Sequence, residues 1–537
     1  MTFPIKGKKH RNSVLFKRRA REGTSISATT LSHPASKHGK VDRPENRDPS
    51  SLTNHTERPG FTGSDIEAES EGNSFYASSS SPPIAKEHPV IMIPDTFTEL
   101  PPLRDLLNTQ TSFLQEQTIQ ECLPFLSGKA GIPANTHGVP HLDRSRHIQF
   151  LHKSLGKKPS AYVAADASRP WMFYWALAGL ATMGEDISSY RERIISTCRP
   201  IQNLTGGFGG GNGQMSHLAP TYAVVLSLAM VGGQEALDII DRKAMWKWLG
   251  ALKTSSGGFR MAIGGEEDIR GAYCALILIT LLSLPLDLPQ DAPIRSSGLT
   301  TMLDGLPEYI GRCQTLEGGI AARPDAEAHG AYAFLAVASL CILGEPHVTI
   351  PKYLDVPGFI SWLSARQYAP EGGFSGRTNK LVDGCYSHWI GGCWPLLEAC
   401  LEGPTQHSGE VSSSVQSPVN LYSRDGLIRY ILCCCQDQGK RGGLRDKPSH
   451  TSDSYHTCYV LAGLSSAQHK WHFNASVENT EESGTLSSPY RWTSEPYVET
   501  TQIYDEEDRV GTLHPIFVIP EGVAEETRAY FASKGSF

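Results

Sequence analysis

The stretch FISWLSARQYAPEGGFSGRTNKLVDGCYSHWIGGCWPLLEAC, residues 359–400, contains one complete unit of the pattern that decides the fold. Its first part, Phe359–Arg366, carries apolar residues at helical spacing beside a polar face, which predicts a helix on the outside of a domain. The triplet Gly372-Gly373-Phe374 follows it. Beyond a loop, Tyr386–Cys400 is more uniformly apolar, which is typical of a buried helix. The unit therefore predicts an outer helix, a glycine turn and an inner helix.

The same unit recurs along the chain. Gly-Gly-apolar triplets also begin at Gly206, Gly257, Gly318 and Gly442, so successive triplets lie about 51, 61, 54 and 70 residues apart. Further outer helices are expected at Ala244–Lys253, Thr301–Cys313 and Asp425–Cys435, and further inner helices at Pro220–Val231, Gly271–Leu284, His329–Leu343 and Tyr455–Ser466. Glycine at the triplets allows the chain to turn after a helix and to approach neighbouring chain closely.

Repeated pairs of outer and inner helices predict an all-α fold. Segments with the alternating pattern of β-strands are almost absent. A chain of such pairs can form an open helical solenoid or a closed ring of helical hairpins, with inner helices surrounded by outer ones. The repeat by itself leaves these two architectures open.

The helical pattern covers only part of the chain. Residues 1–88 predict a disordered tail, because a basic start is followed by Ser-, Thr-, Asn- and Pro-rich sequence without hydrophobic period. The repeat domain is expected over residues 89–470, and residues 471–537 are expected to form a C-terminal extension that packs on the domain or trails it. Polar insertions are expected at Pro285–Ser297 and Glu402–Pro418, and the extension has apolar segments at Trp492–Ile503 and Leu513–Ile519.

Composition favours a cytoplasmic protein without nucleic-acid binding or a membrane span. The net charge of −7 argues against a general nucleic-acid binder, which needs a basic surface. The N-terminal segment lacks the apolar core of a secretory signal, and no run of about 18 apolar residues occurs. The 12 cysteines include the run Cys433–Cys435 in an apolar segment, where buried free thiols in a reducing compartment are expected.

A carboxylate, a thiol and an imidazole lie near the starts of two expected inner helices. They belong to Asp383-Gly384-Cys385 and to His456 in the sequence Tyr455-His456-Thr457-Cys458. Helix starts in a ring of hairpins share one end, so these groups can converge, and three protein ligands would leave a zinc ion a fourth position for substrate. A buried structural cysteine beside a hydrogen-bonded histidine is the alternative interpretation of these residues.

A second group of residues suits a phosphate-bearing ligand. His329 begins an inner helix, Arg377 and Lys380 lie in the loop Gly376–Lys380, and Tyr386 follows the expected metal ligands. A guanidinium fork, an ammonium and neutral donors together fit a diphosphate. A solvated loop that carries surface cations is the competing interpretation.

Aromatic residues recur on the expected inner helices. Trp171 and Trp175 share one helix face, as do Tyr455 and Tyr459. Tyr273, Tyr332 and Trp389 begin or line other inner helices. Such side chains could line a cavity for a long apolar ligand, although most aromatic residues at helical spacing are core residues.

Read together, several segments resemble the β subunits of protein farnesyltransferases. The matching blocks, in family order, are DASRPW at 166–171, GNGQMSHLAPTY with its tyrosine at 222, DIRGAYC at 268–274, EAHGAY at 327–332, GGFSGRTNKLVDGCYSHW at 372–389 and the segment 446–459. The resemblance implies an α-α barrel (a toroid of helical hairpins) around an apolar cavity. It therefore favours the closed ring over the open solenoid.

The resemblance also implies roles for individual residues. It makes Asp383, Cys385, His456, Lys380 and Tyr386 the catalytic residues, with one zinc ion on the first three and a magnesium ion at Asp446. It assigns the isoprenoid diphosphate to His329, Arg377, Lys380, Tyr386, Arg270, Tyr273 and Trp389. It assigns the substrate peptide to Trp171, Trp175, Tyr455 and His217, with Arg270 near the peptide's C-terminus. Departures from better-known members are Ala331, Leu335, His388 and His450.

The implied reaction transfers farnesyl from farnesyl diphosphate to the cysteine of a C-terminal C-a-a-X sequence. Its implied partners are an obligate α subunit and C-a-a-X proteins such as small GTPases. The β subunit of a type I geranylgeranyltransferase is the nearest alternative. Bulky Trp171 and Tyr459, together with the carboxylate of Asp446, favour the farnesyl enzyme. A terpene cyclase would need an Asp-x-Asp-Asp cluster, which is absent from the sequence, and a non-enzymatic helical-repeat adaptor would have no use for metal and phosphate ligands at one barrel end.

Overall fold

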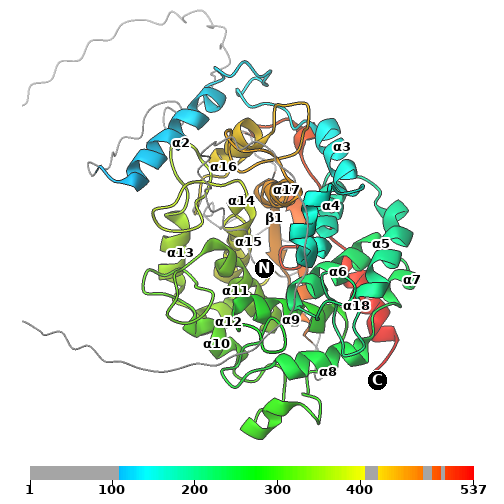
Figure 1. The fold of residues 1–537 in the computed structure, drawn as a ribbon. Coiled ribbons are helices and arrows are strands. Elements are labelled where there is room, and N and C mark those ends of the chain that lie inside the picture. Colours follow the sequence, from blue (N-terminus) through cyan, green and yellow to red (C-terminus); the bar gives the residue numbers. More distant parts are fainter. Residues whose placement is uncertain (1–107, 406–420, 476–485, 498–501) are drawn as a thin grey trace, which may run out of the picture. The chain divides into compact units, whose positions relative to one another are not determined.

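Helices dominate the part of the chain that the computed structural model describes, residues 108–405, 421–475, 486–497 and 502–537 (Figure 1). The expected all-α class is thus confirmed. The tail expected over residues 1–88 lies outside the described residues, as does most of the insertion expected at Glu402–Pro418. None of the described helices is both long and apolar enough to cross a bilayer.

The inner helices form a closed ring. They are α4 (Arg169–Thr182), α6 (Leu218–Val231), α9 (Ile269–Leu281), α11 (Gly330–Leu343), α14 (Tyr386–Trp389) with α15 (Cys393–Glu402), and α17 (Ser454–Gln468). Each contacts the next in this order, and α17 returns to pack along α4. The contact between the last and the first inner helix decides for the closed ring over the open solenoid.

An outer helix precedes each inner one along the chain. The outer helices are α3 (Arg144–Ser154), α5 (Arg191–Cys198), α8 (Arg242–Leu252), α10 (Leu306–Arg312), α13 (Val356–Ser364) and α16 (Arg424–Tyr430), the last continuing into η5 (Ile431–Cys435). Every residue of α6 and α9 is buried, whereas α5 buries only Ile194 and Cys198. This difference matches the expected division into buried inner helices and half-exposed outer ones. The outer element α16–η5 departs from it, because most of its residues are buried and α2 packs on η5.

Connecting elements complete the described fold. They are α2 (Gln110–Leu126), η1 (Ser160–Ser168), η2 (Ser188–Tyr190), η3 (Arg199–Ile201), α7 (Gln234–Leu237), η4 (Pro293–Ser297), α12 (Pro346–Tyr353), η6 (Ser488–Tyr490), η7 (Glu506–Asp508) and α18 (Val523–Ser533). Strands β1 (His469–Phe473) and β2 (Trp492–Pro496) form an antiparallel pair, with His469 opposite Pro496. The sequence predicted no such pair. The segment of β1 follows α17 directly, and its extended conformation depends on pairing with a segment that is distant in the sequence.

Two expected helices are shorter or broken for local reasons. The helix expected at Thr301–Cys313 begins at Leu306, because Gly305 adopts a φ of 68° and Pro307 fits the first turn. The helix expected at Tyr386–Cys400 is interrupted between α14 and α15. Pro395 has no N–H for the carbonyl of Gly391, so the helical hydrogen bonding cannot run through this point.

The first glycine of each triplet lies against the backbone of the next outer helix. A Cβ atom on Gly206 would lie 2.1 Å from the carbonyl oxygen of Ala244 in α8. A Cβ atom on Gly442, in the last triplet, would lie 2.6 Å from the carbonyl oxygen of Arg146 in α3. The same contact that joins neighbouring repeats therefore also closes the ring, which explains why the triplets require glycine.

Polar contacts reinforce the closure. Gln436 accepts a hydrogen bond from the backbone N–H of Asp143 (2.9 Å) and donates one to the carbonyl of His141 (3.0 Å). His147 of α3 lies 2.9 Å from the same Gln436 oxygen through Nε2, while its Nδ1 accepts from the N–H of Gly443 at 2.9 Å. This arrangement assigns the proton to Nε2, and burial lowers the pKa of His147, which favours the neutral ring.

The glycine contact at the closure gives a stability prediction. Gly442→Ala should lower the free energy of unfolding by about 3 kcal/mol or more, because the new methyl group meets the α3 backbone as well as an unfavourable φ of 68°. Gly298→Ala is the matched control, since Gly298 has a φ of 85° but no atom within 4 Å of the added Cβ. It should cost about 1–2 kcal/mol. The free energy of unfolding of both variants is measured by denaturant unfolding. Equal losses in the two variants would contradict the role of the close approach between Gly442 and the α3 backbone.

The C-terminal segment covers one end of the ring. The N–H of Gly511 donates to the carbonyl of Thr182 (2.7 Å), and the hydroxyl of Ser465 donates to the carbonyl of Gly511 (2.8 Å). The hydroxyl of Tyr490 donates to the carbonyl of Thr280 (3.1 Å). Thr182, Ser465 and Thr280 all lie near the C-terminal ends of inner helices. The opposite end, where the inner helices begin, carries the candidate site.

Candidate active site

Every triplet places one polar side chain at the start of an inner helix. The residue nine positions after the apolar residue of each triplet is His217, Asp268, His329, Asp383 or Asp453. Each of these side chains accepts a hydrogen bond from a backbone N–H two or three residues further on, belonging to Ala219, Arg270, Ala331, Cys385 and His456 respectively. Histidines and carboxylates from five repeats therefore meet at one end of the ring. This spacing could have found Asp268 and Asp453, which the sequence analysis did not single out.

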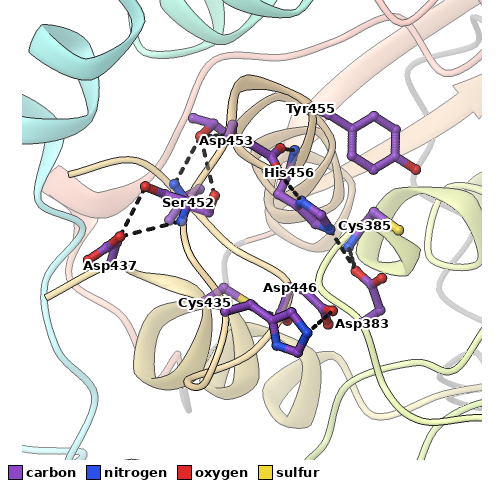
Figure 2. Close-up of polar contacts among 12 residues, drawn as sticks. Asp383, Cys385, Cys435, Asp437, Asp446, Ser452, Asp453, Tyr455 and His456 are labelled. Carbon is purple, nitrogen blue, oxygen red and sulfur yellow. Dashed lines mark hydrogen bonds and ion pairs between the residues drawn. The ribbon is translucent and has the colours of Figure 1, made fainter. Parts of the chain in front are cut away.

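Asp383, Cys385 and His456 come together as the sequence predicted. Their candidate ligand atoms all lie within 4.8 Å of one another, and Figure 2 shows the side chains meeting beside the start of α17. The Nε2 atom of His456 is 3.1 Å from a carboxylate oxygen of Asp383. Cys385 and His456 are buried, whereas Asp383 is partly exposed. The cluster therefore faces solvent on one side only.

Asp453 orients the histidine of this cluster. Its carboxylate lies 2.8 Å from Nδ1 of His456, which turns Nε2 toward Asp383 and Cys385 (Figure 2). A carboxylate on the far nitrogen is the usual support of a metal-binding histidine. Oxygen, sulfur and nitrogen donors with this support fit a zinc ion, and three protein donors leave one tetrahedral position for another ligand.

Charges in the cluster are arranged for a cation. Burial raises the pKa of the Cys385 thiol to about 12, and the neighbouring Asp383 carboxylate adds to this effect. Burial would also raise the pKa of Asp383, but the adjacent His456 imidazole brings it below its ordinary value. Burial alone would lower the pKa of His456, yet the carboxylate of Asp383 raises it well above the ordinary value. A divalent cation at this point would stabilise the thiolate and displace the imidazole proton.

Asp446 lies beside the cluster with its carboxylate already paired. Its carbonyl accepts the N–H of Gly384 at 2.9 Å, and its side chain forms a buried ion pair with Lys447. The second carboxylate oxygen lies 3.5 Å from Nε2 of His450. Burial, with Asp383 nearby, raises the pKa of Asp446 to about 6. The predicted magnesium ligand therefore shares its two oxygens with the ammonium of Lys447 and the imidazole of His450, both from its own loop.

The predicted diphosphate residues are brought together only in part. Nε2 of His329 lies 3.1 Å from the hydroxyl of Tyr386, and Nδ1 of His329 accepts the N–H of Ala331. The proton of this ring is thus assigned to Nε2, and burial lowers the pKa of His329 to about 4, so the ring is a neutral donor. Arg377 forms an ion pair with Glu327 at 2.6 Å. Lys380 is exposed and lines a separate cavity of about 850 Å³ beside α2.

Aromatic rings form a closed circuit inside the ring of helices. Each ring lies within about 6 Å of the next, measured between centroids. The circuit runs from Trp171 through Tyr222, Tyr273, Phe334, Trp389, Tyr459, Tyr455 and Trp175 back to Trp171. Its members come from α4, α6, α9, α11, α14 and α17. The interior of the ring of helices, here called the lumen, therefore carries aromatic side chains from all of these inner helices. They include Tyr222 and Phe334, which the sequence analysis did not single out.

Comparisons with known proteins agree with this architecture. Residues 142–519 match the family described as the prenyltransferase alpha-alpha toroid domain. The protein farnesyltransferase subunit beta of Pyricularia oryzae is 55% identical over 83% of this chain and 85% of its own. The subunit of the same name from Schizosaccharomyces pombe is 36% identical over 80% of this chain and 98% of its own. The chain belongs to the protein farnesyltransferase β-subunit family.

Geranylgeranyl transferases are more distant from this farnesyltransferase-family chain. The geranylgeranyl transferase type-1 subunit beta of Arabidopsis thaliana is 25% identical over 62% of this chain and 87% of its own. A solved structure of Candida albicans protein geranylgeranyltransferase-I complexed with GGPP is 21% identical, covers 74% of this chain and all of that one, and has a TM-score of 0.51. At that identity the structural likeness shows the α-α toroid fold alone.

Arg270 is held rigidly at the same end of the lumen in this β-subunit-family chain. Its guanidinium is buried and pairs with Asp268, at 2.9 Å through Nε, and with Glu266 at 2.8 Å. His217 caps the neighbouring inner helix through Nδ1, and burial lowers its pKa to about 4, so Nε2 is a neutral donor. Glu266 belongs to this cluster, and the sequence analysis did not single it out.

Two departures from better-known members have clear surroundings. His388 is buried between the rings of Phe334 and Tyr459, at centroid distances of 4.4 and 5.3 Å. Burial lowers its pKa to about 3, so it packs as a neutral aromatic ring. His450 contacts Asp446 from the loop surface, as described above. His388 therefore occupies its position without adding a buried charge.

Proposed function

We propose that this chain is the catalytic subunit of a protein farnesyltransferase, active as a heterodimer with an α subunit in the cytoplasm. It would transfer farnesyl from farnesyl diphosphate to the cysteine thiol of C-terminal C-a-a-X sequences, including those of small GTPases. One observation carries this proposal: the aromatic circuit lies in the same ring of helices as the Asp383–Cys385–His456 cluster and the His329–Tyr386 pair, and its member Tyr455 contacts His456 at a centroid distance of 5.0 Å.

The metal cluster would hold the reacting thiol. Asp383, Cys385 and His456 would bind one zinc ion, with Asp453 fixing the imidazole. Such an ion supplies a Lewis acid that keeps a substrate thiol deprotonated near neutral pH. In the reaction a bond forms between the cysteine sulfur and C1 of the isoprenoid. The bond from C1 to the diphosphate oxygen breaks, and the thiol proton has already left to solvent.

The donors opposite the cluster would stabilise the leaving diphosphate. His329 offers an Nε2–H, Tyr386 a hydroxyl and Arg377 a guanidinium fork. Negative charge grows on the diphosphate as C1 departs, and donors held in place before the reaction are the most effective there. Lys380 would add a fourth donor, and a second cationic group beside Arg377, from the exposed end of the same loop. Asp446 is proposed to bind magnesium. For this its carboxylate has to release Lys447 and take the metal ion in its place.

The substrates would share the aromatic lumen. The isoprenoid would lie against Tyr273 and Trp389, and the aliphatic C-a-a-X positions against Trp171, Trp175 and Tyr455. Apolar and aromatic walls with a few placed polar groups are typical of such cavities. His217 and the fixed guanidinium of Arg270 would face the carboxylate end of the peptide.

Trp171 gives the test of farnesyl selectivity. Trp171→Thr should shift the ratio of kcat/KM for farnesyl over geranylgeranyl diphosphate by about 100-fold toward the longer isoprenoid, because the indole occupies the space of an added prenyl unit. The ratio is measured by competition between the two diphosphates, with the co-expressed heterodimer and a panel of C-a-a-X peptides. Trp246→Thr, a surface indole on α8, is the control and should leave the ratio unchanged. A type I geranylgeranyltransferase is the alternative, and preference of the wild-type heterodimer for geranylgeranyl diphosphate would establish it.

A further inference from the structure

A short C-terminal loop, residues 513–520, forms the layer behind the aromatic lumen. Ile516, Phe517, Val518 and Ile519 are all buried. The N–H of His514 donates to the carbonyl of Ile519 (2.8 Å), and the N–H of Val518 returns to the carbonyl of His514 (3.0 Å). Val518 adopts a φ of 58°, as a tight reversal of the chain requires. The loop therefore has a single, internally bonded conformation.

His514 fixes this conformation from inside the loop. Its Nδ1 accepts the N–H of Ile516 at 3.1 Å, and its Nε2 lies 2.9 Å from the carbonyl of Pro489. The side chain is 1% exposed, so neither contact is open to water. A buried imidazole with both nitrogens engaged holds the loop to the segment around Pro489. The carbonyl groups of residues 516–518 are left to accept hydrogen bonds from the ring of helices.

Three tyrosines of the inner helices donate hydrogen bonds to these carbonyl groups. The hydroxyl of Tyr273 donates to Ile516 (2.7 Å), that of Tyr174 to Val518 (3.0 Å) and that of Tyr222 to Phe517 (3.4 Å). The tyrosines come from α9, α4 and α6, which are three different inner helices. All three rings are buried, so their hydroxyls need protein partners. The loop supplies one to each, and the hydroxyls of Tyr222 and Tyr273 also lie 3.4 Å from each other.

Two of these rings support Trp171. The centroids of Tyr174 and Tyr222 each lie 5.6 Å from that of Trp171 and 5.9 Å from each other. The chain of contacts thus runs from His514 through the loop carbonyls and the tyrosine hydroxyls to the indole proposed to limit isoprenoid length. Movement of the loop would remove the anchor of both supporting rings.

We propose that the loop at residues 513–520, fixed by His514, is a positioning element that sets the isoprenoid length accepted by the lumen. It holds Tyr174 and Tyr222 against Trp171, and the loop itself closes the lumen behind them. Without these anchors the loop no longer holds the two rings against Trp171, and a longer isoprenoid fits. This inference rests on the proposed function, because it concerns the selectivity of that same site.

The test compares isoprenoid binding in variants of the full heterodimer. The double variant Tyr174→Phe/Tyr222→Phe keeps both rings and removes only their hydroxyl anchors. The measurement is the ratio of the dissociation constants for geranylgeranyl and farnesyl diphosphate, obtained by direct titration, together with KM and kcat for each. The ratio should fall at least about tenfold, which corresponds to about 1.4 kcal/mol. The change should appear mainly in KM for geranylgeranyl diphosphate.

Tyr490→Phe is the matched control. It removes a partly buried tyrosine hydroxyl bonded to a backbone carbonyl at the same end of the ring, that of Thr280, and none of the bonds between the loop and the Trp171 wall. Its ratio should stay within about twofold of the wild type at a similar loss of stability. Both His514→Asn and His514→Ala should lower the ratio. The fall should be larger for His514→Ala, because asparagine retains one acceptor for the loop.

The outcomes separate this inference from the proposed function. A wild-type heterodimer that prefers farnesyl diphosphate, with a double variant that keeps that preference, overturns the role of the loop and leaves the proposed function standing. A wild-type heterodimer that binds neither diphosphate overturns both. An equal fall of the ratio in Tyr490→Phe and in the double variant also overturns the inference, because general loosening of the C-terminal segment would then explain the change.

Discussion

Cys385→Ala is expected to remove the zinc ion from the heterodimer and to lower kcat by on the order of 1,000-fold, equivalent to about 4 kcal/mol of transition-state stabilisation. The thiol is one of three protein donors in the cluster. Without it, only the carboxylate of Asp383 and the imidazole of His456 remain to bind the ion. His456→Ala should have the same effect. Metal content is measured on the purified heterodimer by elemental analysis, and kcat is measured in single-turnover experiments with saturating substrates.

Two control variants sharpen this test. Cys198→Ala removes an equally buried thiol from the outer helix α5 and should leave both zinc content and kcat unchanged. Asp453→Asn keeps the ligands but weakens the support of His456, so zinc affinity should fall about 10–100-fold. If Cys385→Ala still binds one zinc ion per chain with wild-type affinity, the cluster is not the zinc site. Its cysteine and histidine would then be structural residues that are only packed together.

Arg377→Ala is expected to lower kcat/KM for farnesyl diphosphate by about 100- to 1,000-fold, because one preorganised donor to the departing diphosphate is lost. The guanidinium is held near the His329–Tyr386 pair by Glu327, at 2.6 Å, and faces solvent on its other side. Arg377→Lys should recover part of the loss, since an ammonium provides the charge without the two-pronged geometry. Steady-state kinetics and the affinity for diphosphate alone separate binding of the leaving group from its stabilisation during the reaction.

The repeat supplies a matched control for this arginine. Arg323 lies five residues after the first glycine of its triplet, as Arg377 does after Gly372, and its side chain is exposed. Arg323→Ala removes the same charge one repeat earlier and should change kcat/KM by less than about twofold. Similar losses in Arg323→Ala and Arg377→Ala would point to a general electrostatic attraction of the diphosphate and against a specific contact.

Sequence analysis could identify the metal cluster because its members follow a repeated unit. Asp383 and His456 lie near the starts of inner helices, so helical periodicity and the glycine triplets were enough to place them at one end. Glu266 was missed because its importance comes from its contact with Arg270 and not from any local pattern. Asp453, which contacts His456, was also missed, although its spacing from the last triplet could have found it. Lys380 was grouped with the diphosphate residues, whereas its exposed side chain lines a cavity beside α2. Its predicted role stays a prediction.

The sequence alone determined the all-α class, the division into inner and outer helices and the glycine turns between them. These features depend on hydrophobic period and backbone freedom over a few tens of residues, and both can be read locally. Tertiary structure alone decided that the ring closes, since Gln436 meets Asp143 and Gly442 meets Arg146 across almost the whole repeat domain. It also decided which nitrogen of His329 donates and which loop supports Trp171, because a proton's position and a ring's neighbours depend on groups far away in the chain.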